Sequence, residues 1–184
     1  MRPGGRAGKA GSAAFAALLT LAMASETACA QQRIRRSQEA MVRQKIADTW
    51  VEVHYRRPVA RGRRLFGEVV LWGRTWTPGA DTATSIALST PVQVEGQTLP
   101  QGSYSIWMIP DSTGPWTVIF SKATPVFHIP YPGESHDQLR LQVTPQQGPH
   151  MESLLWYFPN VDGPDATLVM HWGTTGVPLR LHVE

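Results

Sequence analysis

The chain has 184 residues, with 17 lysines and arginines against 14 aspartates and glutamates. Three of the basic residues and one of the acidic residues lie in the first 30 positions, so residues 31–184 carry 14 and 13, a net charge of +1. This length suits one domain with its own core, and the small charge excess excludes nucleic acid as the expected partner.

The first 30 residues have the parts of a secretory signal peptide: a basic start, a short apolar segment and a cleavage motif of small residues. These parts are Arg2, Arg6 and Lys9, then residues 13–24, then Ala28-Cys29-Ala30. We therefore expect cleavage after Ala30 and a periplasmic or secreted protein. The apolar segment is too short to span a bilayer as a helix, and an uncleaved N-terminal anchor is the alternative.

The only cysteine, Cys29, lies just before the expected cleavage position. Acylation of this thiol would give a lipoprotein, but Glu26 stands where lipoprotein signals carry an aliphatic residue, so this alternative is less favoured. Cleavage after Ala30 would leave a mature chain without disulfides, thiolate metal ligands or a cysteine nucleophile. Its stability must then come from its hydrophobic core.

Residues 31–39 are polar and are expected to form a flexible arm, and residues 40–184 are expected to form one domain without linkers or repeats. Alternation of apolar and polar residues recurs throughout this domain, bounded by glycine and proline. The expected strands cover residues 42–46, 50–57, 84–94, a hairpin arm at 96–110, and 116–121, 139–143, 154–158, 168–172 and 177–183. Such spacing without a convincing helix predicts an all-β fold, an antiparallel, jelly-roll-like β-sandwich.

Prolines and tryptophans refine this prediction. Pro91 and Pro100 cannot donate to a strand ladder, so they should lie at edges, bulges or strand starts. Three tryptophans alternate in phase with aliphatic residues and are expected in the core, namely Trp116, Trp156 and Trp172. The positions of Trp72, Trp76 and Trp107 are less determined, because they lie beside glycine, arginine or serine.

The segment from residue 57 to residue 81 holds the expected ligand site. Arginine binds carboxylate, phosphate or sulfate through paired hydrogen bonds, and indole rings offer flat apolar surfaces for a sugar or another flat ligand. The candidate ligand-binding residues are Arg57, Arg63, Trp72, Arg74, Trp76 and Asp81. Alternatively, the arginines of this region face water or pair with Glu52, Glu68 or Asp81, and Trp76 plugs the end of the sandwich. These arginines are Arg56, Arg57, Arg61, Arg63, Arg64 and Arg74.

The proline-rich loop at 123–137 contains two histidines, His128 and His136, near carboxylates. Imidazole and carboxylate are suitable transition-metal ligands, but the spacing matches no known metal motif, so these two are weak candidates and no cofactor is predicted. His171 and His182 fall on the polar faces of their strands and are expected at the surface.

Several spaced motifs resemble the bacterial exported family called domain of unknown function 2911. They are Tyr55-Arg56-Arg57-Pro58, Gly62-Arg63, Phe66-Gly67, Gly73, Trp76, Gly79-Ala80, Ala83-Thr84, Gly96, Leu99-Pro100, Gly102, Tyr104-Ser105, Ile109-Pro110, the segment 116–120 and Ala166-Thr167-Leu168. The resemblance covers nearly all of the expected mature chain and implies an exported β-rich domain. Family members tend to carry arginine, asparagine and an acid where this chain has Thr77, Asp81 and Thr82, so a family site at these positions would be altered here.

Motifs of hydrolases and nucleotide-binding proteins are missing from the sequence, including the nucleophile elbow, the zinc-protease helix motif and the glycine-rich phosphate loops. This favours a non-catalytic binding or interaction module of the cell envelope, with a small molecule, a glycan or an envelope protein as partner. The alternative is an envelope hydrolase that acts on a glycan or another small substrate through paired carboxylates.

Overall fold

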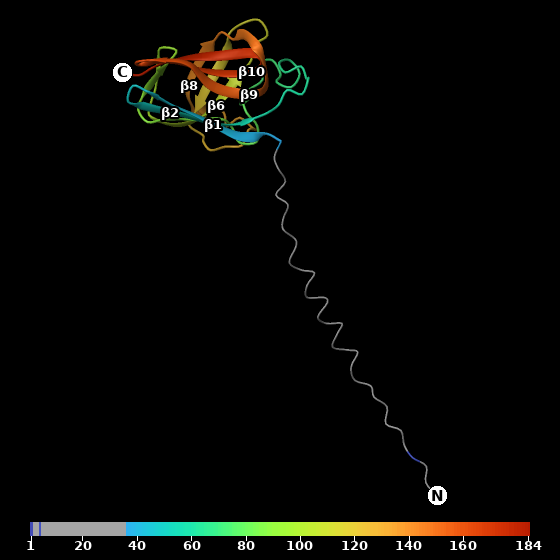
Figure 1. The fold of residues 1–184 in the computed structure, drawn as a ribbon. Helices are drawn as coiled ribbons and strands as arrows, with labels where there is room; N and C mark the ends of the chain where they lie inside the picture. The colour runs from blue at the N-terminus through green and yellow to red at the C-terminus, as the bar shows by residue number, and fades with distance from the viewer. Residues whose placement is uncertain (2–3, 5–35) are drawn as a thin grey trace. The chain divides into compact units, whose positions relative to one another are not determined.

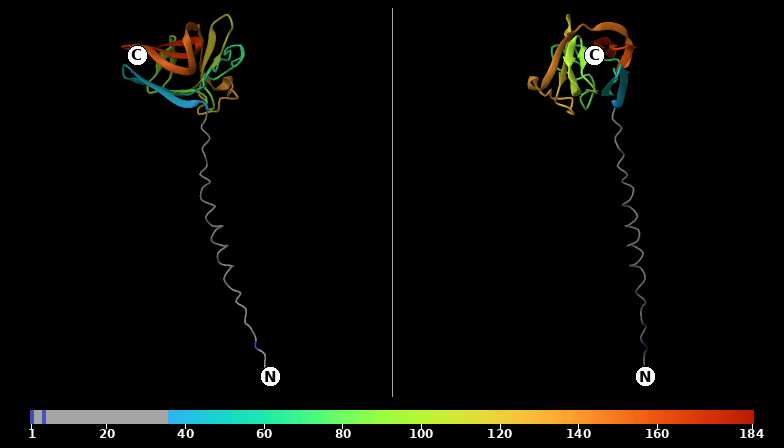
Figure 2. Two further views of the ribbon diagram at one scale, coloured as in Figure 1. Left: turned by 45° about the vertical axis from the view of Figure 1, so that its right-hand side comes forward. Right: turned by 90° about the vertical axis from the view of Figure 1, so that its left-hand side faces the viewer.

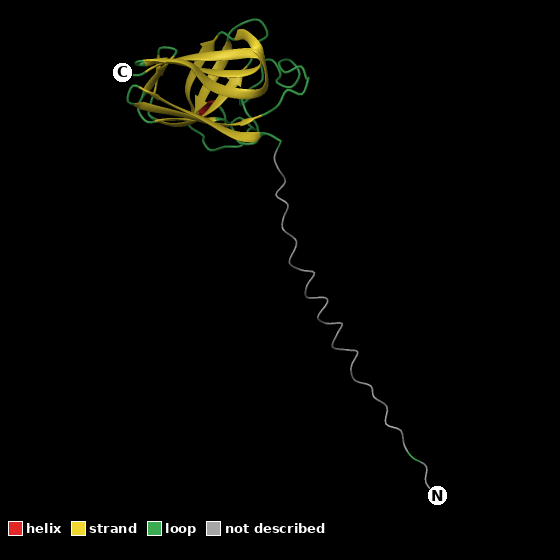
Figure 3. Cartoon of the chain, in the orientation of Figure 1, coloured by secondary structure: helices red, strands yellow, loops and turns green. Residues whose placement is uncertain are grey.

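The computed structural model describes residues 36–184, together with Met1 and Gly4 (Figure 1). The expected signal peptide and residues 31–35 of the expected arm otherwise lie outside the described residues. Residues 36–184 form two antiparallel sheets, which confirms the predicted β-sandwich (Figure 3). One sheet has the strand order β1-β2-β3-β6-β7-β8, and the other has the order β5-β4-β10-β9.

The first sheet contains β1 (Gln38–Ile46), β2 (Thr49–Arg57), β3 (Ser85–Leu88), β6 (Gly102–Ile109), β7 (Trp116–Ser121) and β8 (Asp137–Val143). The second contains β4 (Val92–Val94), β5 (Gln97–Leu99), β9 (Gln146–Asp162) and β10 (Asp165–His182). A 3₁₀ turn at Glu134–His136 precedes β8. Among the described residues, no helix is long and apolar enough to cross a membrane.

Three hairpins use two-residue turns in which at least one φ angle is positive, among them the β9–β10 turn, where Gly163 has φ 56°. Ala47 begins the turn between β1 and β2 with φ 46°, and Glu95 and Gly96 join β4 to β5 with φ 50° and 76°. Turns of this kind match the right-handed twist of the strands that they connect. They explain why consecutive strands pair directly in these parts of the chain.

Prolines mark the places where the chain changes sheets. Pro91 lies directly before β4, where the chain leaves the first sheet, and Pro100 lies between β5 and β6, where it returns. Both therefore lie at strand boundaries, as the missing N–H group requires. The sequence predicts one hairpin arm over residues 96–110, and the structure divides this segment between the two sheets at Pro100.

The core lies between the sheets and consists of the inward-facing residues of both. Trp116, Trp156 and Trp172 are buried there, as predicted. A second, smaller cluster lies on the outer face of the first sheet, where Trp107 and Ile119 are buried beneath the proline-rich loop. Trp107 is therefore a core residue of this second cluster, with its Nε1 donating to Ser105 Oγ at 2.9 Å.

Strand β10 replaces the two separate strands expected near the C-terminus. The buried, inward-facing residues here are even-numbered over 166–172 and odd-numbered over 177–183, and the register with β9 shifts on either side of Gly173. Gly173 has φ 59°, and a Cβ there would lie 2.8 Å from Leu65 Cδ1. A bulge at this glycine thus bends the long β9–β10 hairpin, which is the orange-to-red ribbon of Figure 2.

Candidate functional site

The segment expected to hold the site connects β2 to β3 and lies against the sandwich at several points. Isolated bridges join Val59 to Ser153 and Trp76 to Met108, and the second is closed by hydrogen bonds of 2.8 and 2.7 Å between the two backbones. Thr77 is buried and donates from its hydroxyl to Ile106 O at 2.8 Å. These contacts fix the segment on a rigid scaffold, as a binding loop requires.

Five aromatic rings form a group that we call the aromatic cluster, in which four tryptophan rings surround Phe66. Its ring centroid lies 4.8 Å from that of Trp116, 6.1 Å from Trp76, 6.2 Å from Trp72 and 6.5 Å from Trp172. Trp76 also stacks on Trp172 at 6.2 Å with an interplanar angle of 17°. Trp76 therefore packs on the core, while Trp72, 40% exposed, keeps a face toward solvent.

Two of the candidate arginines donate to backbone carbonyls. Arg57 Nε donates to Leu154 O at 3.1 Å, which ties β2 to β9. Arg63 donates from Nε to Ala60 O at 2.9 Å and from Nη2 to Val59 O at 2.8 Å. These bonds orient the Arg63 guanidinium and stabilise the local turn.

The structure also contains two of the ion pairs considered as alternatives for this region. Arg64 pairs with Glu68 at 3.9 Å on the surface, and Arg56 lies 3.9 Å from the Asp81 carboxylate. An ion pair between exposed side chains, such as Arg64–Glu68, contributes little to stability. Arg74 is exposed.

One cavity, which we call the arginine pocket, brings part of the predicted set together. Its volume is about 330 Å³, and three arginines and two indole rings line it. No carboxylate belongs to its lining among the described residues. Of the predicted site residues, Arg63 and Trp76 line it, whereas Arg57, Trp72, Arg74 and Asp81 do not. Its lining consists of Arg36, Ser37, Pro58, Val59, Arg61, Arg63, Val69, Trp76, Gly79 and Trp172.

Asp81 belongs to a different contact. It has φ 60°, and its carbonyl oxygen accepts from His128 twice, from the backbone N at 2.8 Å and from Nδ1 at 2.7 Å. Asp81 thus joins the candidate segment to the proline-rich loop. One ring nitrogen of His128 is consequently engaged in a structural hydrogen bond.

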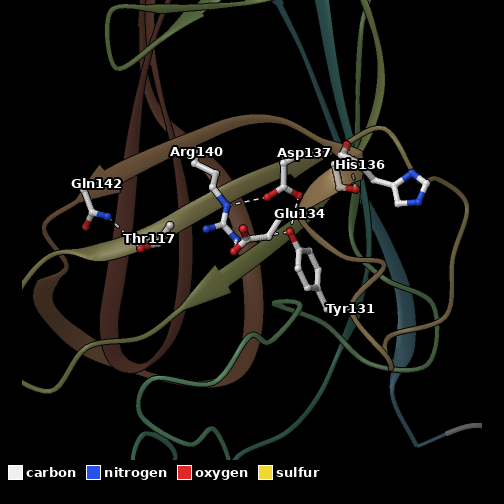
Figure 4. Close-up of polar contacts among 8 residues, drawn as sticks. Thr117, Tyr131, Glu134, His136, Asp137, Arg140 and Gln142 are labelled. Carbon is white, nitrogen blue, oxygen red and sulfur yellow. Dashed lines mark hydrogen bonds and ion pairs between the residues drawn. The ribbon is translucent and has the colours of Figure 1, made fainter.

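The second weak metal candidate, His136, directs its imidazole away from the neighbouring polar network (Figure 4). Within residues 36–184, no group of three or more histidine, cysteine, aspartate or glutamate side chains is arranged to hold a metal ion. Neither histidine therefore has the ligand set that a protein metal site needs.

The polar network of Figure 4 fastens the proline-rich loop to β8. Asp137 accepts hydrogen bonds from the Tyr131 hydroxyl and, at 2.6 Å, from Arg140 Nε, and Arg140 also pairs with Glu134 at 3.2 Å. Tyr131 packs its ring on Trp107 at a centroid distance of 5.4 Å. Burial, and then the hydrogen bond to Asp137, raise the pKa of Tyr131 to about 12.

A larger cavity, of about 660 Å³, is bordered by residues of both sheets, and the sequence does not predict it. Strands β8, β9 and β10 line it, and His171 is one of the lining residues. The expectation of a surface position for His171 is wrong, because this residue is only 3% exposed. Alternation correctly predicts the outer face of β10 for this residue, but Gly148 of β9 lies close against its ring there.

Comparison with known proteins gives one result. No curated protein and no solved structure matches the chain. A family model described as "Protein of unknown function (DUF2911)" matches residues 37–181, which is nearly the whole described domain. The match covers both sheets and the aromatic cluster. The chain therefore belongs to the family DUF2911.

Proposed function

We propose that the protein is an exported, non-catalytic binding module whose ligand carries an anionic group and a flat apolar part. The observation that carries this proposal is the arginine pocket, where Arg36, Arg61 and Arg63 line one cavity together with Trp76 and Trp172. Guanidinium groups bind carboxylate, phosphate and sulfate with paired hydrogen bonds.

The geometry of Arg63 supports a role in binding. Two backbone carbonyls hold its Nε and Nη2 in place, and its other N–H groups remain available to a ligand. An oriented donor group loses less rotamer entropy on binding than a freely moving side chain. Trp76, which is only partly buried, adds flat apolar surface beside these donors, which suits a sugar ring or an aromatic group.

Hydrolysis of a glycan would need two carboxylates that face one cavity. The arginine pocket has none in its lining. Glu134 and Asp137 approach a common group, but both are engaged by Arg140, in a network that fastens a loop. These observations support binding rather than hydrolysis.

The anion proposal is tested by replacing single arginines with glutamine. Arg61→Gln is expected to weaken binding of an anionic probe about tenfold, because one charge-assisted hydrogen bond is lost. Trigalacturonate, citrate and sulfate are suitable probes, measured by calorimetry at low and high salt.

Arg74→Gln is the matched control, because Arg74 is also an exposed arginine of the same segment but does not line the pocket. It should bind each probe as the unsubstituted protein does. Equal binding by Arg61→Gln, Arg36→Gln and Arg74→Gln would exclude the arginine pocket as the anion site.

Export is a separate part of the proposal and rests on the signal-peptide pattern of residues 1–30. We expect the mature protein to begin at Gln31. Intact-mass measurement of protein recovered from the periplasm or medium checks this directly. A mass that includes Cys29 with an acyl chain, or one that retains the whole leader, would contradict it.

A further inference from the structure

A second cavity, which we call the β10 groove, lies where the bent β9–β10 hairpin faces β8. Its volume is about 660 Å³, which is within the range of small-molecule sites. Figure 1 labels the three strands that contribute to it. It shares no lining residue with the arginine pocket.

The residue that distinguishes this groove is His171. Its side chain is buried, and neither ring nitrogen has a hydrogen-bond partner among the residues that the structure describes. A buried polar group without a partner destabilises a fold, and most such groups in native proteins are bonded, so each exception requires an explanation. His171 does not lack neighbours, since its ring stacks on Tyr157 at 6.4 Å with an interplanar angle of 27°.

The backbone of Gly148 lies close to the edge of this ring. A Cβ on Gly148 would lie 2.9 Å from His171 Cε1 and 3.4 Å from Nε2, so only glycine allows such a close approach. Residues 148–150 lie between the register pairs Gly173–Met151 and Thr175–Gln147 and are not themselves paired with β10. A shift of this unpaired stretch would expose the imidazole to the groove without breaking a pair of the β9–β10 ladder.

The walls of the groove are polar but carry no net charge. Glu95 and Arg180 line it and neutralise each other's charge, because Glu95 accepts from the Arg180 backbone N at 2.7 Å and from Arg180 Nε at 2.9 Å. The remaining polar groups are amides, hydroxyls and the imidazole, which both donate and accept hydrogen bonds. They belong to Gln142, Gln146, Gln147, Thr144, Thr167, Tyr157 and His171.

A neutral ligand rich in hydroxyl groups matches these walls. Hydroxyl groups also donate and accept, so they can satisfy amides, threonines and a neutral imidazole together. The Tyr157 ring and three prolines, Pro149, Pro159 and Pro178, offer apolar surface for the C–H faces of a sugar. A charged ligand would find no uncompensated opposite charge in the groove.

We infer that the β10 groove binds a neutral oligosaccharide and that His171 contacts a hydroxyl of that ligand. Binding would supply the hydrogen bond that the imidazole lacks. The unsatisfied ring is then a feature of the site, because residues that serve binding are often poorly optimised for stability.

The test is His171→Leu, which removes the ring nitrogens at similar volume. Affinity for a neutral oligosaccharide should fall about tenfold or more, while Tm should rise by about 2–4 °C because an unsatisfied buried group is gone. The probes are chitotetraose, cellotetraose and xylotetraose, measured by calorimetry. Tyr157→Ala is the second variant and should also weaken binding.

Arg74→Gln is the matched control and should bind the neutral probes as the unsubstituted protein does, since Arg74 lines neither cavity. The two proposals can fail separately, because neither depends on the other. Failure of all three neutral probes to bind at about 5 mM, which corresponds to roughly −3 kcal/mol, would overturn the inference. Equal affinity in His171→Leu would also overturn it, even if Tm rises.

Discussion

Replacing Trp172 by alanine is expected to lower the free energy of unfolding by about 3–5 kcal/mol. Its side chain is 2% exposed, stacks on Trp76 and meets the edge of Phe66. These contacts join β10 to the long segment between β2 and β3, so the alanine would leave a cavity between elements that cannot close it easily. Urea unfolding followed by circular dichroism measures the change.

Two controls identify the cause. Trp72→Ala removes a ring of the same aromatic cluster that is 40% exposed, and it should lower the free energy of unfolding by only about 1 kcal/mol. Trp172→Phe keeps a ring and removes Nε1, which is buried without a partner, so it should be milder than the alanine change. If Trp172→Ala were no more destabilising than Trp72→Ala, the ring would not be a core residue.

The strands were predictable because each has one buried face. In β2, Val51 and Val53 are fully buried and alternate with polar residues, and this pattern determines both the strand and its orientation. The prolines at sheet changes were predictable for an equally local reason, the missing N–H group. The fold class follows from such local signals repeated along the chain.

The merger of two expected strands into β10 was not predictable from alternation. The inward-facing positions change from even to odd around Gly173. In the sequence, a turn between two strands and a bulge within one strand both produce this change in the alternation. What decides between them is the close approach of Leu65, a residue more than a hundred positions earlier in the chain. Contacts of this range leave no local pattern.

The candidate site shows the same limit. The sequence places Arg57 and Arg63 near each other but does not give the direction of their side chains. Arg57 turns toward Leu154 O of β9, while Arg63 turns toward its own loop and the arginine pocket. His171 was assigned to the surface because alternation identifies the face of a strand and not what lies above that face. The only local signal for its cover is Gly148, whose effect requires the bulge to be known.

Replacing Asp137 by alanine is the second change with a large expected effect, a loss of about 2–3 kcal/mol in the free energy of unfolding. The Asp137 side chain is 8% exposed and accepts from both Tyr131 and Arg140. Its removal would leave the partly buried Tyr131 hydroxyl and Arg140 Nε without the acceptor that they share. The proline-rich loop, which covers Trp107, would then be held less firmly.

Glu134→Gln is the matched control for this network, because Glu134 also pairs with Arg140 but is 77% exposed. It should change the free energy of unfolding by no more than about 0.5 kcal/mol, as expected for a surface ion pair.

A second measurement reports on the network itself. Because the hydrogen bond to Asp137 helps to raise the pKa of Tyr131, Asp137→Ala should make this phenol ionise at lower pH. A phenolate absorbance titration measures this change, and the Tyr131→Phe variant identifies which part of the signal comes from Tyr131. Equal stability of Asp137→Ala and Glu134→Gln, with an unchanged Tyr131 titration, would show that the loop is held by the packing of Tyr131 on Trp107 and not by the carboxylate.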